Sequence, residues 1–169
     1  VQDDLTVTDD VTIGGDIDLE GSIDVNGTAN LDIVDVDGAV NFAADVTFAD
    51  GADIITASAG TSNFRAGVNA GNSIESGGEK NVCVGDESGT ALTTGDQNVA
   101  IGFEALKTED AASSSVAVGA LALSTQDAGA GDAYNTAVGR KAGFAISTGV
   151  QNTLIGGLAG DALTNSVLN

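Results

Sequence analysis

One phrase of nine residues returns through the second half of the chain, and it constrains the fold more than any other feature of the sequence. It reads "NVAIGFEAL" at 98–106, "SVAVGALAL" at 115–123, "NTAVGRKAG" at 135–143 and "NTLIGGLAG" at 152–160. Its glycine, here called the landmark glycine, falls at Gly85, Gly102, Gly119, Gly139 and Gly156, with a degenerate first copy at Gly67. The steps are 18, 17, 17, 20 and 17 residues, so the segment 59–169 is predicted to be a repeat domain.

Each repeat contains one alternating strand such as 99–101, a glycine turn, a second short apolar stretch and a polar loop. A unit this short cannot bury its own strand. Coils stacked about 4.8 Å apart, however, pair every strand with its neighbours and build one continuous core. The sequence therefore predicts an all-β protein in which one repeat forms one coil of a repetitive β-solenoid.

A polar residue opens each copy of the phrase and is predicted to occupy the same place in every coil. These residues are Asn81, Asn98, Ser115, Asn135 and Asn152. Stacked copies are expected to bond side chain to side chain, or to cap the neighbouring loop. Together with the landmark glycines, the asparagines are the candidate structural residues of the repeat.

Residues 1–58 repeat with a different period. Apolar pairs separated by one residue recur every six residues, as in Ile17/Leu19 and Ile23/Val25, with a single step of five later in the series. Both side chains of such a pair face the same side of a strand, and the Gly, Asp and Asn residues between pairs supply bends. The segment is predicted to be a hexad-repeat β-helix shaft.

Two architectures are compatible with the hexads. One is a single-chain left-handed β-helix with three hexads per coil, and the other is a triple β-helix in which each layer takes one strand from each of three chains. A lone ribbon buries too little apolar surface to offset the entropy of ordering its backbone. We favour the homotrimer, because a single-chain solenoid of this length would be short, with both ends unprotected.

The charge balance excludes some classes of partner. The chain has 25 acidic and 5 basic residues and a net charge of -20, which repels phosphate backbones and anionic lipids. We therefore expect no nucleic-acid partner. The sequence also lacks an apolar stretch of about 18 residues, so we expect no membrane insertion.

The residue types available argue against catalysis. The sequence has no His, which excludes a Ser/His/Asp triad and a His-based metal site. Its one cysteine, Cys83, takes the place of Ala100, Ala117 and Ala137 in the repeated phrase, and is expected to be a small packed residue. We predict that the protein is not an enzyme and uses no cofactor and no specific metal site.

Two charged groups are interpreted as surface features. Asp16, Asp18 and Glu20 alternate as in part of a calcium loop, but they fit the hexad rhythm as outward residues, where they would bind cations only diffusely. Arg140 and Lys141 form the only adjacent basic pair. They are expected to meet an acidic neighbour across a chain interface, with a charged host glycan as the alternative.

The phrases "NVAIGFEAL", "SVAVGALAL" and "NTAVGRKAG" resemble the head repeats of trimeric autotransporter adhesins, and "AISTGVQNTLIGGLAGDALTNS" resembles repeats of tail-fibre proteins of tailed phages, especially phages of marine bacteria. In such fibres, hexad stretches like "DVTIGGDIDLEGSIDVNGT" precede the coil repeats. The resemblance covers nearly the whole chain. It implies a left-handed parallel β-roll over 59–169 within a homotrimeric fibre. The coiled-coil stalk, neck pattern and membrane anchor of an autotransporter are not seen in this sequence, which favours the phage fibre.

The expected function is therefore structural. The chain is predicted to belong to a phage tail or capsid fibre on the virion, to associate with other virion or fibre proteins, and to help attachment to a host surface glycan or protein. The alternative is a bacterial trimeric adhesin, or another extracellular filament protein, at the bacterial cell surface.

Overall fold

The computed structural model describes residues 56–167 continuously, together with 14–15, 25–26, 34, 36–37, 40, 42–44 and 46. By its internal contacts the chain divides into two units, Val1–Thr47 and Phe48–Asn169. The hexad shaft predicted for 1–58, including Asp16, Asp18 and Glu20, lies largely outside the described residues. The division into 1–58 and 59–169 therefore stays a prediction, and the fold below is that of the second unit.

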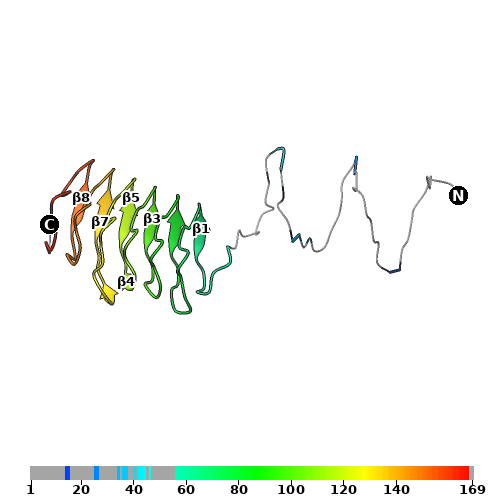
Figure 1. Ribbon diagram of the computed structural model, residues 1–169, viewed down its shortest axis with the longest axis horizontal. Coiled ribbons are helices and arrows are strands. Elements are labelled where there is room, and N and C mark those ends of the chain that lie inside the picture. Colours follow the sequence, from blue (N-terminus) through cyan, green and yellow to red (C-terminus); the bar gives the residue numbers. More distant parts are fainter. Residues whose placement is uncertain are drawn as a thin grey trace. The chain divides into compact units, whose positions relative to one another are not determined.

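The described part of the second unit consists of short strands joined by turns and loops (Figure 1). The strands are β1 (Phe64–Ala66), β2 (Val82–Val84), β3 (Val99–Ile101), β4 (Ala112–Ser113), β5 (Val116–Val118), β6 (Gly131–Asp132), β7 (Thr136–Val138) and β8 (Thr153–Ile155). One parallel sheet has the order β1-β2-β3-β5-β7-β8, and β4 pairs with β6 in a second sheet.

Successive coils stack in strict register. The central residue of β2, Cys83, pairs with Ala100 of β3, and Ala100 pairs in turn with Ala117 of β5. Each step along this sheet is one repeat of the sequence, so the predicted parallel β-solenoid is confirmed, with about five turns. Among the described residues no helix occurs, which makes this part of the chain all-β. It follows that no helix there is a candidate for crossing a membrane.

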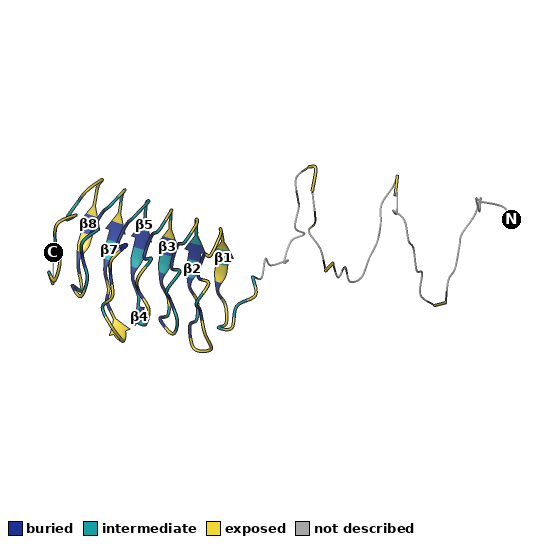
Figure 2. Cartoon of the chain, viewed as in Figure 1, coloured by how far each residue is buried: buried dark blue, intermediate teal, exposed yellow. Residues whose placement is uncertain are grey.

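Each three-residue strand of the six-stranded sheet turns only its central residue toward the core. In β2, Cys83 is fully buried while Val82 and Val84 on either side are half-exposed, as the two-residue period of a strand requires. Figure 2 shows this alternation along the stack. The core is consequently narrow. It consists mainly of small residues from the strands and of alanine, leucine and isoleucine side chains from the turns that follow.

The loops of two adjacent coils form the second sheet, and one of these loops is longer than those of the other coils. The step from β5 to β7 is 20 residues, against 17 for its neighbours, and the additional residues lie in the loop that contains β6. Ser113 of β4 pairs with Asp132 of β6. The hydroxyl of Ser114 also donates a hydrogen bond to Asp132 over 2.7 Å, which ties the two loops together.

Candidate functional site

The asparagines that open most of the coils form a column of buried hydrogen bonds. Asn81 Oδ1 accepts a bond from the main-chain N–H of Asn98 over 2.8 Å. Asn98 Oδ1 accepts the same bond from Ser115, and Asn63 Oδ1 accepts it from Asn81. The spacing of parallel strands places each acceptor directly beneath the next N–H, so the column links each coil to the next.

The amide nitrogens of the same asparagines cap the loops. Asn81 Nδ2 donates to the carbonyl of Gly95, Asn98 Nδ2 to Ala112 and Asn135 Nδ2 to Gly149, over 2.7 to 2.9 Å. Each asparagine thus satisfies one group on the next strand and one carbonyl of a loop. Most of these bonds run to the main chain, and one direct amide pair joins Asn152 to Asn135.

Ser115 interrupts this column, because its side chain is too short to replace an asparagine amide. Gln126 fills the gap: its Nε2 donates to Ser115 Oγ over 3.0 Å, and its Oε1 accepts from Asn135 Nδ2 over 2.8 Å. Gln126 is fully buried. The column therefore continues through a residue that the repeat pattern did not mark.

Gln126 also binds a fully buried carboxylate, that of Glu109. Gln126 Nε2 donates to Glu109 Oε2 over 2.8 Å, and the N–H of Ala128 donates to the same oxygen over 3.1 Å. Glu109 Oε1 accepts from the N–H groups of Asp110 and Ala112. Both carboxylate oxygens are thus satisfied by neutral donors, as a buried charge requires.

Two positions of the repeat change together in the coils that contain Glu109 and Gln126. They occupy the seventh position after the landmark glycine, where the coils toward either end of the stack have Ile74, Leu92, Ile146 and Leu163. The fourth position changes in step: it is glycine beside each aliphatic residue, and Leu106 or Leu123 beside Glu109 or Gln126. A Cβ at Gly89 would lie 2.8 Å from Leu92 Cδ1. Each coil therefore holds one large apolar side chain at this level.

The landmark glycines form a second column, on the turn that follows each strand. A Cβ added to Gly119 would lie 2.6 Å from the carbonyl carbon of Gly139, and the same contact recurs at Gly67, Gly85, Gly102 and Gly139. These glycines also have φ between 116° and 136°, a region that other residues rarely adopt. Glycine is thus required both by the backbone conformation and by the closeness of the next coil.

Arg65 closes the core at its β1 end. It lies in register with Cys83, at the inward position that later coils fill with small or apolar residues. Its Nε donates to the carbonyl of Ala70 over 2.7 Å and its Nη1 to that of Ala57 over 3.2 Å. Among the described strands β1 is the last of this sheet on that side, and there the guanidinium binds these main-chain carbonyls.

Two polar side chains are buried in the core between these columns. Cys83 is fully buried, and burial raises the pKa of its thiol to about 11, which keeps it protonated at neutral pH and suppresses its reactivity as a nucleophile. Ser88 occupies the place of Ala105 and Ala122 in neighbouring coils and is fully buried. Among the described residues, its Oγ is the one buried side-chain polar atom that has no hydrogen-bond partner.

The outward face of the six-stranded sheet is apolar and open to solvent in the single chain. The residues on either side of each central strand position form this face, here called the outer sheet face. It comprises Phe64, Ala66, Val82, Val84, Val99, Ile101, Val116, Val118, Thr136, Val138, Thr153 and Ile155. No charged residue interrupts it, and Ile155 is 71% exposed.

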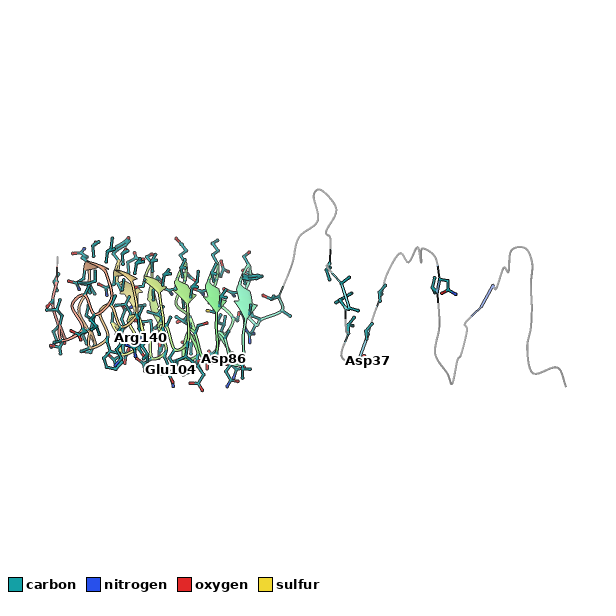
Figure 3. All side chains as sticks on the ribbon, turned by 90° about the horizontal axis from the view of Figure 1, so that it is seen from above. Asp37, Asp86, Glu104 and Arg140 are labelled. Atoms are coloured by element: carbon teal, nitrogen blue, oxygen red, sulfur yellow. The ribbon has the colours of Figure 1, made fainter. Side chains whose placement is uncertain are left out.

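The turns after the landmark glycines carry several charged side chains. Lys107 Nζ bridges two carboxylates of adjacent coils, Glu87 at 2.6 Å and Glu104 at 2.8 Å, and its hydrogen bonds to Glu104 and Glu87 raise its pKa. Asp86, Glu104 and Arg140 lie along the same edge of the stack (Figure 3). Lys141 Nζ lies 5.0 Å from the centre of the Phe144 ring, a cation–π contact.

No group of three or more His, Cys, Asp or Glu side chains in the described ranges is placed to hold a metal ion. The geometry instead serves stacking, since the asparagine column, the glycine column and the core are all directed at the next coil. Comparison with protein-family models, with curated proteins and with solved structures found no match.

Proposed function

We propose that this chain is a structural component of an extracellular fibre, best described as a segment of a phage tail or capsid fibre that extends toward the host. Its coils form a left-handed β-roll, its hexads a triple β-helix, and three chains assemble side by side. The fibre would be anchored by other virion or fibre proteins and would hold a host-contacting element away from the particle. The resemblance of its repeats to fibre and adhesin repeats supports this proposal.

The observation that carries the proposal is the outer sheet face. Val99, Val116 and Val118 lie on it without charged neighbours on the same face, and a soluble monomer rarely leaves so continuous an apolar surface uncovered. The core behind it is narrow, and half of its buried residues are alanine. Three copies packed through this face would bury it and add the apolar area that one chain lacks.

The central test is the oligomeric state of the full chain. Analytical ultracentrifugation is expected to give a trimer at micromolar concentration, and negative-stain microscopy a thin rod that persists in detergent. Val116→Asp would place a charge in the middle of the interface and is expected to give monomers with an unchanged circular dichroism spectrum. Thr94→Asp, at an exposed loop position, is the matched control and should remain trimeric. A monomeric wild-type chain would contradict the proposal.

The alternative is an adhesin whose coils contact the host directly, and one loop favours it. The loop that contains β6 carries Tyr134, which is 54% exposed and donates a hydrogen bond to Asp132 over 3.0 Å. An exposed aromatic ring beside a carboxylate is a combination that suits contact with a glycan or a protein. In this reading the same trimer would bind through its loops.

A cell-binding assay separates the two functions. If the trimer is only a shaft, labelled protein should not bind host cells. If it is an adhesin, it should bind, and Tyr134→Ala should weaken binding at least about tenfold, as expected when an aromatic anchor is lost. Phe103→Ala, which removes another exposed aromatic ring away from this loop, is the control and should bind like the wild type.

A further inference from the structure

The buried layer formed by Glu109 and Gln126 distinguishes two adjacent coils from all the others in this stack. Each coil is named after its landmark glycine. Glu109 belongs to the Gly102 coil, Gln126 to the Gly119 coil, and their side chains meet over 2.8 Å in the core. Neighbouring coils place Leu92 and Ile146 at the same position.

Repetition creates a folding problem that such a layer can solve. The other columns, of glycine, asparagine and small core residues, are nearly the same in every coil. A strand that paired one coil too far along, with the intervening coil looped out, would still set glycine on glycine and a small residue on a small residue. Register is weakly specified wherever the pattern is this degenerate.

We infer that the Glu109–Gln126 layer is a register lock, which fixes the pairing of the Gly102 coil with the Gly119 coil during folding. If the Gly119 coil were looped out, Glu109 would face Ile146 and would lose the donors Gln126 and Ala128. Its Oε2 would then be buried without a donor, which is strongly unfavourable. Buried polar groups that set register are known from coiled coils.

The pairing of the Gly119 coil with the Gly139 coil is not fixed by a buried carboxylate, and this difference makes the register lock testable. If the Gly139 coil were looped out instead, Gln126 would face Leu163 in place of Ile146, and Asn152 would take the place of Asn135. In this slip an apolar side chain is exchanged for another apolar side chain, and one asparagine amide is exchanged for another. The lock thus predicts that this slip occurs more readily than the one that omits the Gly119 coil.

Disulfide trapping compares the slip that omits the Gly119 coil with the slip that omits the Gly139 coil. The experiment is done in a Cys83→Ala background in which Glu109, Gln126 and their bonding partners are unchanged. The pair Val99→Cys and Thr136→Cys becomes adjacent only when the Gly119 coil is skipped, and Val116→Cys and Thr153→Cys only when the Gly139 coil is skipped. Both pairs span 37 residues and lie two strands apart in the native sheet, at about 9.6 Å, beyond disulfide reach. The native pair Val99→Cys and Val116→Cys reports correct register.

Chains are unfolded with reductant, refolded at high dilution under oxidising conditions, and scored for intramolecular disulfides on denaturing gels. The lock predicts that the 116–153 disulfide exceeds the 99–136 disulfide by about tenfold or more. Equal yields, or more of the 99–136 disulfide, would overturn it.

If neither slipped disulfide forms in chains that keep Glu109 and Gln126, a variant without the polar layer tests the inference. Leu106→Gly, Glu109→Leu, Ser115→Asn, Leu123→Gly and Gln126→Leu together give both coils the residues of their neighbours. This variant is expected to yield the 99–136 disulfide at a level similar to that of 116–153. If the 99–136 disulfide stays absent while 116–153 forms, or if only correct register is recovered, the polar layer has no role in register and the inference fails.

Discussion

Asn81 and Asn98 lie directly above one another in adjacent coils, with Asn81 Oδ1 2.8 Å from the main-chain nitrogen of Asn98. The relationship repeats at Asn63 and Asn81 and again at Asn98 and Ser115. Each asparagine therefore stabilises the coil that follows it as well as its own loop.

Asn98→Ala is expected to destabilise the protein by roughly 2 to 4 kcal/mol, because it leaves the N–H of Ser115 and the carbonyl of Ala112 buried without their partners. Urea unfolding followed by circular dichroism measures the change. Asn72→Ala, at an exposed position, is the control and should alter stability by less than about 0.5 kcal/mol. Equal effects of the two substitutions would mean that the column contributes little.

Gly119→Ala and Gly156→Ala separate the two reasons why the landmark position requires glycine, namely its positive φ and the closeness of the next coil. Both residues have φ near the same value, 132° and 126°, so both alanines carry a backbone penalty of about 1 to 3 kcal/mol. A Cβ at Gly119 would also meet Gly139 at 2.6 Å, whereas at Gly156 its nearest neighbour is Ala159 Cβ at 4.0 Å. Thermal unfolding should show the larger loss for Gly119→Ala, and similar losses would contradict the contact with the next coil.

The sequence predicted the β-solenoid because its signal is periodic: one short alternating strand and one glycine recur with nearly constant spacing. It also predicted one of the two ways in which the stacked asparagines bond. They were expected to pair side chain to side chain or to cap loops. The structure shows the loop caps, whereas each Oδ1 chiefly accepts from a main-chain N–H of the next coil rather than from another side chain. The reason is geometric, since the spacing of the coils brings each Oδ1 to an N–H of the next strand.

The Glu109–Gln126 layer was not predicted, because the repeated phrase ends before the seventh position after the landmark glycine. Aligning the coils on that glycine would have revealed it, since glycine with leucine or isoleucine is exchanged there for leucine with a polar residue. Arg65 was missed for another reason. Among the described coils only that of β1 has a charged residue at this inward position, so no repetition marks it.

Ser88→Ala is expected to stabilise the protein by about 1 kcal/mol, because it removes a buried hydroxyl that has no hydrogen-bond partner among the described residues. The replacement is the residue found at the same place in neighbouring coils, so it should pack without strain. Ser115→Ala is the matched comparison: it removes the acceptor of Gln126 and should destabilise by about 1 kcal/mol. Differential scanning calorimetry should therefore show shifts of opposite sign.

The thiol of Cys83 should make stability fall at alkaline pH. Burial raises its pKa from 9.0 to about 11, so the folded chain keeps its proton where the unfolded chain loses it. The stability that the protonated thiol contributes to the fold is fully present below pH 9 and is lost as the pH rises to about 11. Within that window the free energy of unfolding falls by about 1.4 kcal/mol per pH unit.

Cys83→Ala tests this assignment, since alanine occupies the same core position in β3, β5 and β7. The difference in unfolding free energy between wild type and variant should be constant below pH 9 and should shift in favour of the variant above it. Consistent with a buried protonated thiol, an alkylating reagent at pH 8 should modify the wild type only after unfolding. Rapid labelling of the folded chain, or parallel stability profiles up to pH 11, would show that the thiol is accessible or already ionised.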